Sequence, residues 1–384
     1  MDQIVRIARV IKDYDTQGIH RTGTSVDEAS AHWLADEVRS IGLEPSLQGY
    51  EIHRLDPGEC YLEVGGRRIP GVPLYDCHYT DANGVTGKLT AEDGSGDIRL
   101  VNVEQRASEL VATRRATRSK ALVIVTAAHG GGAVTHGDSP GLVLQNAHNF
   151  DAPFGPPVLQ LSNAQADWIR QQTENHAQAR LVATAERTWA HAYNVTAELP
   201  GNDATLAPLV INTPRSGWWE IAAERGSGIA CWLEVMRGLA RQRTSRRVFF
   251  SANSGHELGF SGIEKVLDTY ADLATDATWL HFGANIGATS GTMANVAAST
   301  AELQQLAEAA LARVQRPTQY TVGKSDGGEM ASVHRRGGRR YLALTNDNAY
   351  FHMREDRFAN NVDVSLVAQY AEVFSGIARS LAGH

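Results

Sequence analysis

Hydrophobic and polar positions follow two different rhythms along this chain. At the start, apolar residues recur at helical spacing, which predicts helices at 2–13 and 25–41. Ser25 with Glu28 three residues later predicts a capping box at the start of the second helix, and Gly42 predicts its end. One face of that helix carries its apolar residues: Trp33, Leu34, Val38 and Ile41.

The spacing of apolar residues changes at about residue 54. Short apolar runs separated by glycine turns, such as the glycine-rich 130–132, are typical of strands and tight turns. The predicted strands are 60–64, 74–75, 84–89, 98–103, 121–126, 156–161 and 180–183. One helix, at about 164–175, interrupts them. We therefore interpret residues 54–187 as a separate, mostly β unit.

Strands and helices alternate in the rest of the chain. Strands are predicted at 193–199, 206–213, 247–252, 279–286 and 341–345. Helices are predicted at 227–241, after 252 to about 273, at 301–314 and at 362–381. This alternation predicts an α/β fold in which helices cover both faces of a central sheet.

Length and charge narrow the classes of function. The 384 residues are enough for two domains, and the net charge of −7 without a basic run argues against a nucleic-acid partner. The first residues lack the pattern of a secretory signal, and no apolar stretch is long enough to span a membrane. The three cysteines are scattered, so we expect a reduced, cytoplasmic protein.

Polar and ionisable residues follow the predicted strands of the α/β part. They occur at 212–216, 251–259, 281–285 and 346–352. Because ligands bind at the carboxyl ends of strands in open α/β sheets, we expect these segments to meet in one site.

Five segments of the chain resemble motifs of the dizinc aminopeptidase and glutamate carboxypeptidase family. Residues 224–230, Glu-Arg-Gly-Ser-Gly-Ile-Ala, resemble its Asp-Asn-x-Ser-Gly-Val-Ala turn, and residues 255–259, Gly-His-Glu-Leu-Gly, resemble its Ala-Glu-Glu-Leu-Gly. Residues 284–287, 325–327 and 351–356 resemble its Asp-Met-Ile-Gly, Ser-Asp-His and Tyr-His-Thr-x-x-Asp segments. The motifs follow one another in the family's order.

The resemblance implies how the two parts of the chain are combined. It implies an aminopeptidase-like domain with a central mixed sheet and helices on both faces, formed by residues 1–53 and 188–384. Residues 54–187 lie where many relatives carry a protease-associated domain, and the run Gly-Pro-Pro-Val-Leu-Gln-Leu-Ser resembles that domain. The β unit is therefore expected to be an insertion.

The resemblance also implies a metal site that has lost half of its ligands. The family binds two metal ions through five protein ligands, and Glu224, Glu257 and His352 stand at three of these positions. Pro214 and Ala284 stand at the other two, which belong to the same ion. We therefore expect one divalent metal ion, with zinc the first choice and manganese or iron(II) compatible with the same ligand types.

The remaining site residues suggest an unusual substrate. His256 stands at the family's general-base position, so His256 and Glu257 are the candidate catalytic residues. The candidate substrate-binding residues are Arg215, Trp218, His281, Asn285, Asp326 and Phe351. The resulting hypothesis is a metal-dependent hydrolase of an amide or related C–N bond in a small, non-peptide or acylated substrate. A homo-oligomer is compatible with the sequence.

Alternative interpretations stay open at this point. Glu257 has an alternative role at a helix N-terminus, and both His281 and Trp218 have alternatives as packing residues. Arg215 is a candidate to neutralise Glu224 without any metal, or to bind a substrate carboxylate. The alternatives for the whole protein are a non-catalytic binding module on a decayed peptidase scaffold and a one-metal lyase.

Overall fold

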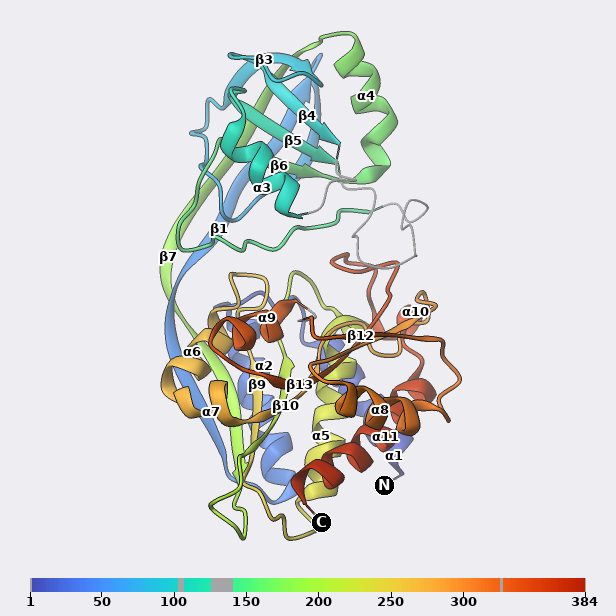
Figure 1. Ribbon diagram of the computed structural model, residues 1–384. Helices are drawn as coiled ribbons and strands as arrows, with labels where there is room; N and C mark the ends of the chain where they lie inside the picture. The colour runs from blue at the N-terminus through green and yellow to red at the C-terminus, as the bar shows by residue number, and fades with distance from the viewer. Residues whose placement is uncertain (1, 103–106, 126–140, 325–326, 384) are drawn as a thin grey trace.

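The computed structural model describes residues 2–102, 107–125, 141–324 and 327–383. Figure 1 shows a larger domain of helices around a sheet, a smaller strand-rich domain above it, and two long strands that run from one to the other. The glycine-rich turn predicted at 130–132 lies outside the described residues. None of the helices in these ranges is long and apolar enough to cross a lipid bilayer.

The larger domain is built on a mixed sheet with a parallel centre. The central strands are, in spatial order, β9 (Val248–Asn253), β8 (Leu209–Pro214), β10 (Thr278–Phe282) and β13 (Arg340–Asn346). β11 (Ala294–Ala298) runs antiparallel to β13 and pairs in parallel with the edge strand β12 (Thr318–Val322). The central strands are almost entirely buried, as expected for a sheet covered on both faces.

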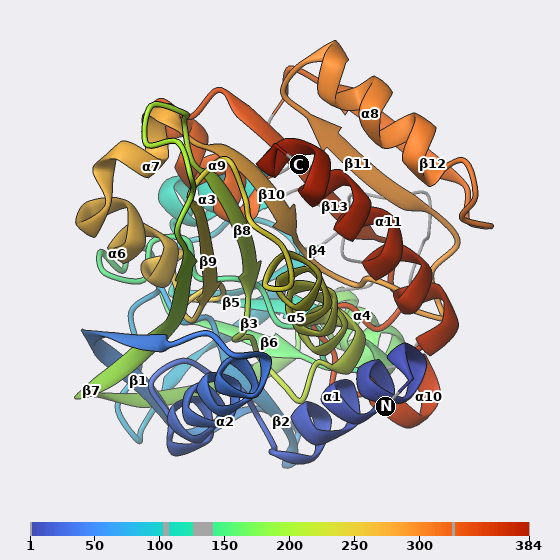
Figure 2. The ribbon, with the colours of Figure 1, turned by 90° about the horizontal axis from the view of Figure 1, so that it is seen from below.

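Helices cover both faces of this sheet (Figure 2). One face packs on α1 (Gln3–Thr16), α2 (Ser25–Ile41), α5 (Ser227–Leu239), α8 (Ala301–Leu311) and α11 (Val364–Ala382). The other face packs on α6 (Ser261–Thr269), α7 (Ala271–Asp276) and α9 (Gly328–Arg335). Along β8, Leu209 and Ile211 join the first core and Val210 joins the second. The predicted α/β architecture is confirmed.

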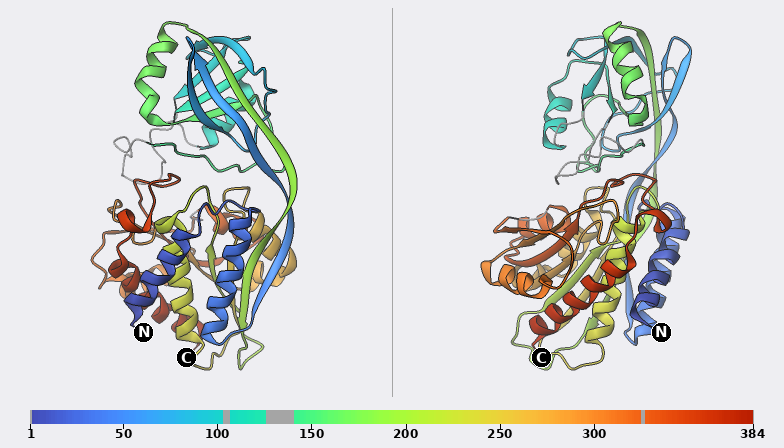
Figure 3. Two further views of the ribbon diagram at one scale, coloured as in Figure 1. Left: turned by 180° about the vertical axis from the view of Figure 1, so that it is seen from behind. Right: turned by 90° about the vertical axis from the view of Figure 1, so that its right-hand side faces the viewer.

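Two long strands connect the domains, as both views in Figure 3 show. β1 (Pro45–Val64) and β7 (Gln178–Leu199) pair antiparallel from Pro45 opposite Ala197 to Val64 opposite Ala179. The boundaries proposed from sequence, at residues 53 and 187, therefore fall inside continuous strands. The smaller domain is carried at the end of this two-stranded ribbon.

The smaller domain is a closed ring of strands. The outer parts of β1 and β7 complete a ring with β2 (Arg67–Pro73), β6 (Val158–Leu161), β5 (Ala121–Val125), β4 (Ile98–Asn102) and β3 (Val85–Thr90). Leu62, Leu89, Val123 and Leu181 belong to its apolar core. The remaining short elements of the chain are α3 (Ala107–Ala116), a 3-10 turn (Asn163–Gln165), α4 (Ala166–Glu174) and α10 (Phe358–Asn361).

Local differences from the sequence expectations have identifiable causes. The cap of α2 is Thr24, whose hydroxyl accepts from the Asp27 amide at 3.3 Å, so the predicted capping box at Ser25 is displaced by one residue. Gly42 ends the helix in the left-handed region at φ 99°, as predicted. Residues 74 and 75 lie outside any strand, and a turn begins at Tyr75.

A buried histidine should make the fold sensitive to acid. His20 is fully buried, its ring stacks 3.7 Å from that of Tyr14, and burial lowers its pKa to about 3. The unfolded chain takes up this proton near pH 6.5, so the stabilisation is present above that pH and is lost as the pH falls. Between pH 7 and pH 5, we expect wild type to lose about 2 kcal/mol more unfolding free energy than His20→Gln, measured by urea titration. Parallel losses in the two proteins would contradict the assignment.

Candidate functional site

The loops that follow the parallel strands meet the inserted domain. Ser216 follows β8, His256 follows β9, Asn285 follows β10 and His352 follows β13. The Leu144 carbonyl lies 2.7 Å from Nδ1 of His352, and the Ala147 amide donates to the carbonyl of Glu257 at 2.9 Å. The sheet edge predicted to carry chemistry is thus covered by a segment of the inserted domain, near the middle of Figure 1.

Glu224 and Arg225 form a buried ion pair beside His352. Both lie on a π-helical turn, η3 (Ala222–Gly226), which leads directly into α5. Oε1 of Glu224 is 2.9 Å from Nη2 of Arg225 and 3.7 Å from Nε2 of His352. Burial raises the pKa of Glu224, and the charge of Arg225 opposes this effect. Single π-turns are frequent at functional sites because they re-aim side chains.

The orientation of η3 is fixed by Asp356. Its carboxylate accepts from the amides of Ala223 and Glu224, at 3.2 and 2.8 Å, and from the side chain of Asn361 at 2.6 Å. Burial raises the pKa of Asp356 to about 7. The final residue of the 351–356 motif therefore holds the backbone that presents Glu224.

The expected three-ligand metal site is not assembled in the described part of the chain. Both carboxylate oxygens of Glu257 accept hydrogen bonds at 2.8 Å, one from the Thr22 amide and one from the Ser216 hydroxyl. Glu224 is paired with Arg225, and in the described ranges no group of three His, Cys, Asp or Glu side chains is arranged to hold a metal ion. These residues, as they are placed, do not fit a metal ion.

A second buried carboxylate organises two histidines. Glu329, at the start of α9, lies 2.7 Å from Nδ1 of His256 and 3.8 Å from Nε2 of His281. Burial alone would raise the pKa of Glu329, but His256, His281 and Arg225 outweigh it and lower that pKa to about 2. Burial lowers the pKa of His281 to about 4, and its Nδ1 is 2.8 Å from Oδ1 of Asn212. At neutral pH the site thus holds an anionic Glu329 and a neutral His281.

Trp218 and Trp219 connect the inserted domain to this site. Nε1 of Trp218 donates to Oδ1 of Asn146, and Nε1 of Trp219 donates to the carbonyl of His352, both at 3.0 Å. Both tryptophans line a cavity of about 380 Å³ together with Tyr75 and Leu144. The position predicted for substrate binding therefore borders an aromatic cavity.

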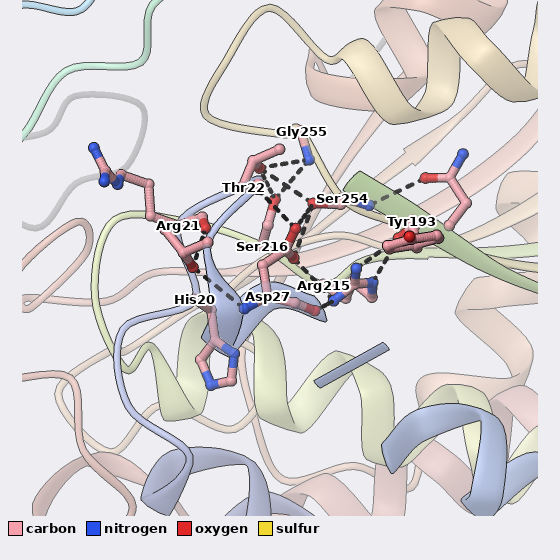
Figure 4. Close-up of polar contacts among 12 residues, drawn as sticks. His20, Arg21, Thr22, Asp27, Tyr193, Arg215, Ser216, Ser254 and Gly255 are labelled. Carbon is pink, nitrogen blue, oxygen red and sulfur yellow. Dashed lines mark hydrogen bonds and ion pairs between the residues drawn. The ribbon is translucent and has the colours of Figure 1, made fainter. Parts of the chain in front are cut away.

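Arg215 lies among the polar contacts of Asp27 and Tyr193, as Figure 4 shows. Its guanidinium is fully buried, lies 3.0 Å from Oδ1 of Asp27 and donates to the carbonyl of Tyr193. Ser254 donates to the same Asp27 carboxylate at 2.9 Å. The cation that neutralises Glu224 is therefore Arg225. The interpretation in which Arg215 neutralises Glu224 is wrong, because Arg215 is paired with Asp27.

The other candidate substrate residues are dispersed around the site. Asn285 is buried, and its Oδ1 accepts from the side chain of Asn348 at 2.9 Å. The ring of Phe351 lies 4.0 Å from that of His352. Asp326 lies outside the described residues.

Backbone strain is concentrated in the loops of this site. Among the described residues, five non-glycine positions have positive φ angles: four lie in these loops, Ile221 (51°), Phe260 (60°), Asn285 (66°) and His352 (60°), and the fifth, His176 (46°), follows α4. Non-glycine residues rarely adopt this region, and it persists where the surrounding structure imposes it, often at functional sites. The clustering favours a functional role for this edge of the sheet.

Two residues of the site were missed by the sequence analysis. Arg225 occupies the place of the asparagine in the Asp-Asn-x-Ser-Gly motif. An arginine directly after Glu224 is the sequence feature that could have indicated this ion pair. Glu329 follows the 325–327 motif, and no sequence pattern indicates a functional role for it. Its role depends on α9 bringing it to His256.

Comparisons with known proteins agree with this architecture. The chain is similar to a zinc aminopeptidase from Bacillus subtilis (17% identity, TM-score 0.77) and to an aminopeptidase from Aneurinibacillus sp. strain AM-1 (15%, 0.73), covering 99% of this chain and 94% of each structure. It is also similar to a peptidase M28 precursor from Shewanella amazonensis SB2B (17%, TM-score 0.76), over 99% of this chain and 96% of that one. At these identities the likeness establishes the fold.

Sequence comparison adds a family assignment for part of the chain. None of the curated proteins matches. The family model described as Peptidase family M28 matches residues 221–378, which begin at η3 and end in α11. This segment includes Glu224, His256, Glu329 and His352. Residues 221–378 therefore carry the sequence pattern of Peptidase family M28, in a chain that has the aminopeptidase fold over nearly its whole length.

Proposed function

We propose that this protein is a hydrolase that cleaves an amide or related C–N bond in a small, non-peptide or acylated substrate. The match to Peptidase family M28 and the fold shared with aminopeptidases support the reaction class. The observation that carries the proposal is the contact of 2.7 Å between Nδ1 of His256 and the carboxylate of Glu329.

This contact provides a general base. A buried, anionic Glu329 holds the proton of His256 on Nδ1 and leaves Nε2 as the basic nitrogen. Nε2 takes a proton from a water molecule as its oxygen attacks the carbonyl carbon of the substrate. The C–N bond then breaks, the proton passes to the leaving nitrogen, and the products are a carboxylate and an amine. Glu329 stabilises the imidazolium between the two steps.

The charge of the site favours a substrate without a free amino group. In dizinc relatives, the second ion and nearby carboxylates commonly help to hold the free amine. Here the carboxylate of Glu224 is already paired with Arg225, which leaves it a poor partner for a substrate ammonium group. The aromatic cavity beside Trp218 and Trp219 instead suits an apolar acyl or aryl group.

The zinc dependence expected from the sequence would require a rearrangement of the site. One-metal catalysis would need Glu224, Glu257 and His352 as ligands. Glu224 is paired with Arg225, and both carboxylate oxygens of Glu257 accept hydrogen bonds from Thr22 and Ser216, whereas the contact of Nδ1 of His352 with the Leu144 carbonyl is compatible with ligation through Nε2. The mechanism above assigns no step to a metal ion. Zinc is named for the Bacillus subtilis aminopeptidase and is not needed by the His256–Glu329 pair.

An amide library tests the proposal. Wild type is incubated with matched N-acylated and unacylated aryl amides, and the released arylamine is measured. We expect release from acylated compounds, with a loss of roughly 10²–10⁴-fold in His256→Ala. His334→Ala, an exposed histidine on α9, is the matched control and should keep full activity. Release that is equal in wild type and His256→Ala would contradict the mechanism, and binding without release would favour a binding module.

A further inference from the structure

Arg225 carries a buried positive charge next to the carboxylate of Glu224. Its side chain is fully buried; Nε and Nη1 donate hydrogen bonds to backbone carbonyls, and Nη2 makes an ion pair with Glu224 without a hydrogen bond. Nε donates to the carbonyl of Ser216 at 3.0 Å, Nη1 donates to the carbonyl of Glu224 at 3.2 Å, and Nη2 lies 2.9 Å from Oε1 of Glu224. A buried guanidinium held in this way is a fixed part of the site.

The guanidinium competes with a metal ion for one oxygen atom. Oε1 of Glu224 is the atom nearest to Nε2 of His352, at 3.7 Å, and these two atoms are the pair that an ion would have to join. Nη2 of Arg225 contacts the same Oε1. A dication at this position would lie against a buried guanidinium, and their repulsion is strong where water does not screen it.

The surrounding structure holds the pair in place. Asp356 fixes the amide of Glu224, and the Oε2 atom of Glu224 accepts from the amide of His352 at 3.2 Å. Glu224 therefore has a fixed backbone and a fixed carboxylate. The Ser216 carbonyl that binds Arg225 belongs to the residue whose hydroxyl binds Glu257, so Arg225 also holds the loop that engages the third expected ligand.

We propose that Arg225 is a built-in cation that takes the place of the metal ion beside Glu224 and keeps this site metal-free. The inference concerns the charge of the site and does not depend on which reaction the protein catalyses. The role of the arginine in the 224–230 motif is then to supply the positive charge that a metal ion supplies in the family. Replacing that arginine with the neutral asparagine of the family should restore metal binding.

Metal analysis of purified proteins tests this role. Wild type and the variants are purified without chelator or metal resin, incubated with zinc, manganese or iron(II), desalted and analysed for bound metal. We expect no stoichiometric metal in wild type or in Arg225→Lys, which keeps the charge. We expect about one zinc ion per chain in Arg225→Asn, with a zinc-dependent rise in its melting temperature.

Two results would overturn the proposal. One is a stoichiometric ion in wild type that is lost in Glu224→Gln, a result that does not depend on any Arg225 variant folding. The other is a folded Arg225→Asn protein, verified by circular dichroism, that binds no more zinc than wild type. Neither result bears on the amide assay, so the two proposals can fail separately.

Discussion

Glu329→Gln is expected to lower kcat/KM for the best amide substrate by roughly 10²-fold or more. Glutamine retains an acceptor for His256 but lacks the negative charge that stabilises the imidazolium. Its amide can also donate to Nδ1 and thereby favour the wrong tautomer. The change should lower kcat more than it raises KM, since the proposed role of Glu329 acts through His256. Steady-state kinetics from pH 5 to pH 9 measure both effects.

A double variant separates this role from a structural one. If His256 and Glu329 act as a unit, His256→Ala combined with Glu329→Gln should be no slower than the slower single variant. Glu264→Gln, on a partly exposed carboxylate paired with Arg335 and Arg336, is the matched control and should leave kcat/KM unchanged. An unchanged kcat/KM in Glu329→Gln, or additive losses in the double variant, would contradict the general-base pair.

Arg215→Met is expected to destabilise the fold by about 3–5 kcal/mol, because it leaves a buried carboxylate unpaired. Asp27 and Arg215 are both fully buried and 3.0 Å apart. Burial already raises the pKa of Asp27, and Arg215 is the charge that opposes this effect. Urea denaturation at pH 7 gives the loss of unfolding free energy directly.

Two comparisons show whether the buried charge is the cause. Asp27→Leu combined with Arg215→Met removes both charges and should recover part of the lost stability. Arg247→Met breaks only half-exposed ion pairs with Glu198 and Asp272, and should cost no more than about 1 kcal/mol. Equal losses of unfolding free energy in Arg215→Met and Arg247→Met would show that the buried pair with Asp27 stabilises the fold no more than the half-exposed ion pairs do.

The fold was largely predictable because local patterns and tertiary packing agree. The face of α2 that carries Leu34 and Val38 packs into the main core, and Gly42 ends the helix. The strand predicted at 206–213 forms β8, which is buried throughout. Here apolar periodicity and glycine positions suffice, because each element's sequence favours the conformation that the core also requires.

Other elements depend on partners that are distant in sequence. β7 was predicted as two short strands, yet it continues through the polar stretch 184–192 because β1 pairs with it along nearly its whole length. The strand predicted at 279–286 ends at Phe282, since Asn285 adopts a left-handed conformation. Neither outcome is encoded in the local pattern.

The candidate site was predictable in position but not in its pairing. The motifs place Glu224, His256, Glu257 and His352 at one edge of the sheet, and they do lie there. From the sequence, Arg215 was the arginine considered for Glu224, but the structure pairs Arg215 with Asp27 and Arg225 with Glu224. The pairing of Arg215 requires α2, which packs against β1, β7 and α5, to bring Asp27 to it, and it cannot be derived from spacing alone.

The most direct test of the account is arylamine release by wild type after exhaustive dialysis against a zinc chelator. We expect the same kcat/KM before and after dialysis, because the proposed base is the His256–Glu329 pair and the cation beside Glu224 is Arg225. Loss of activity on dialysis, with recovery when zinc alone is returned, would contradict it and favour a metal-dependent hydrolase.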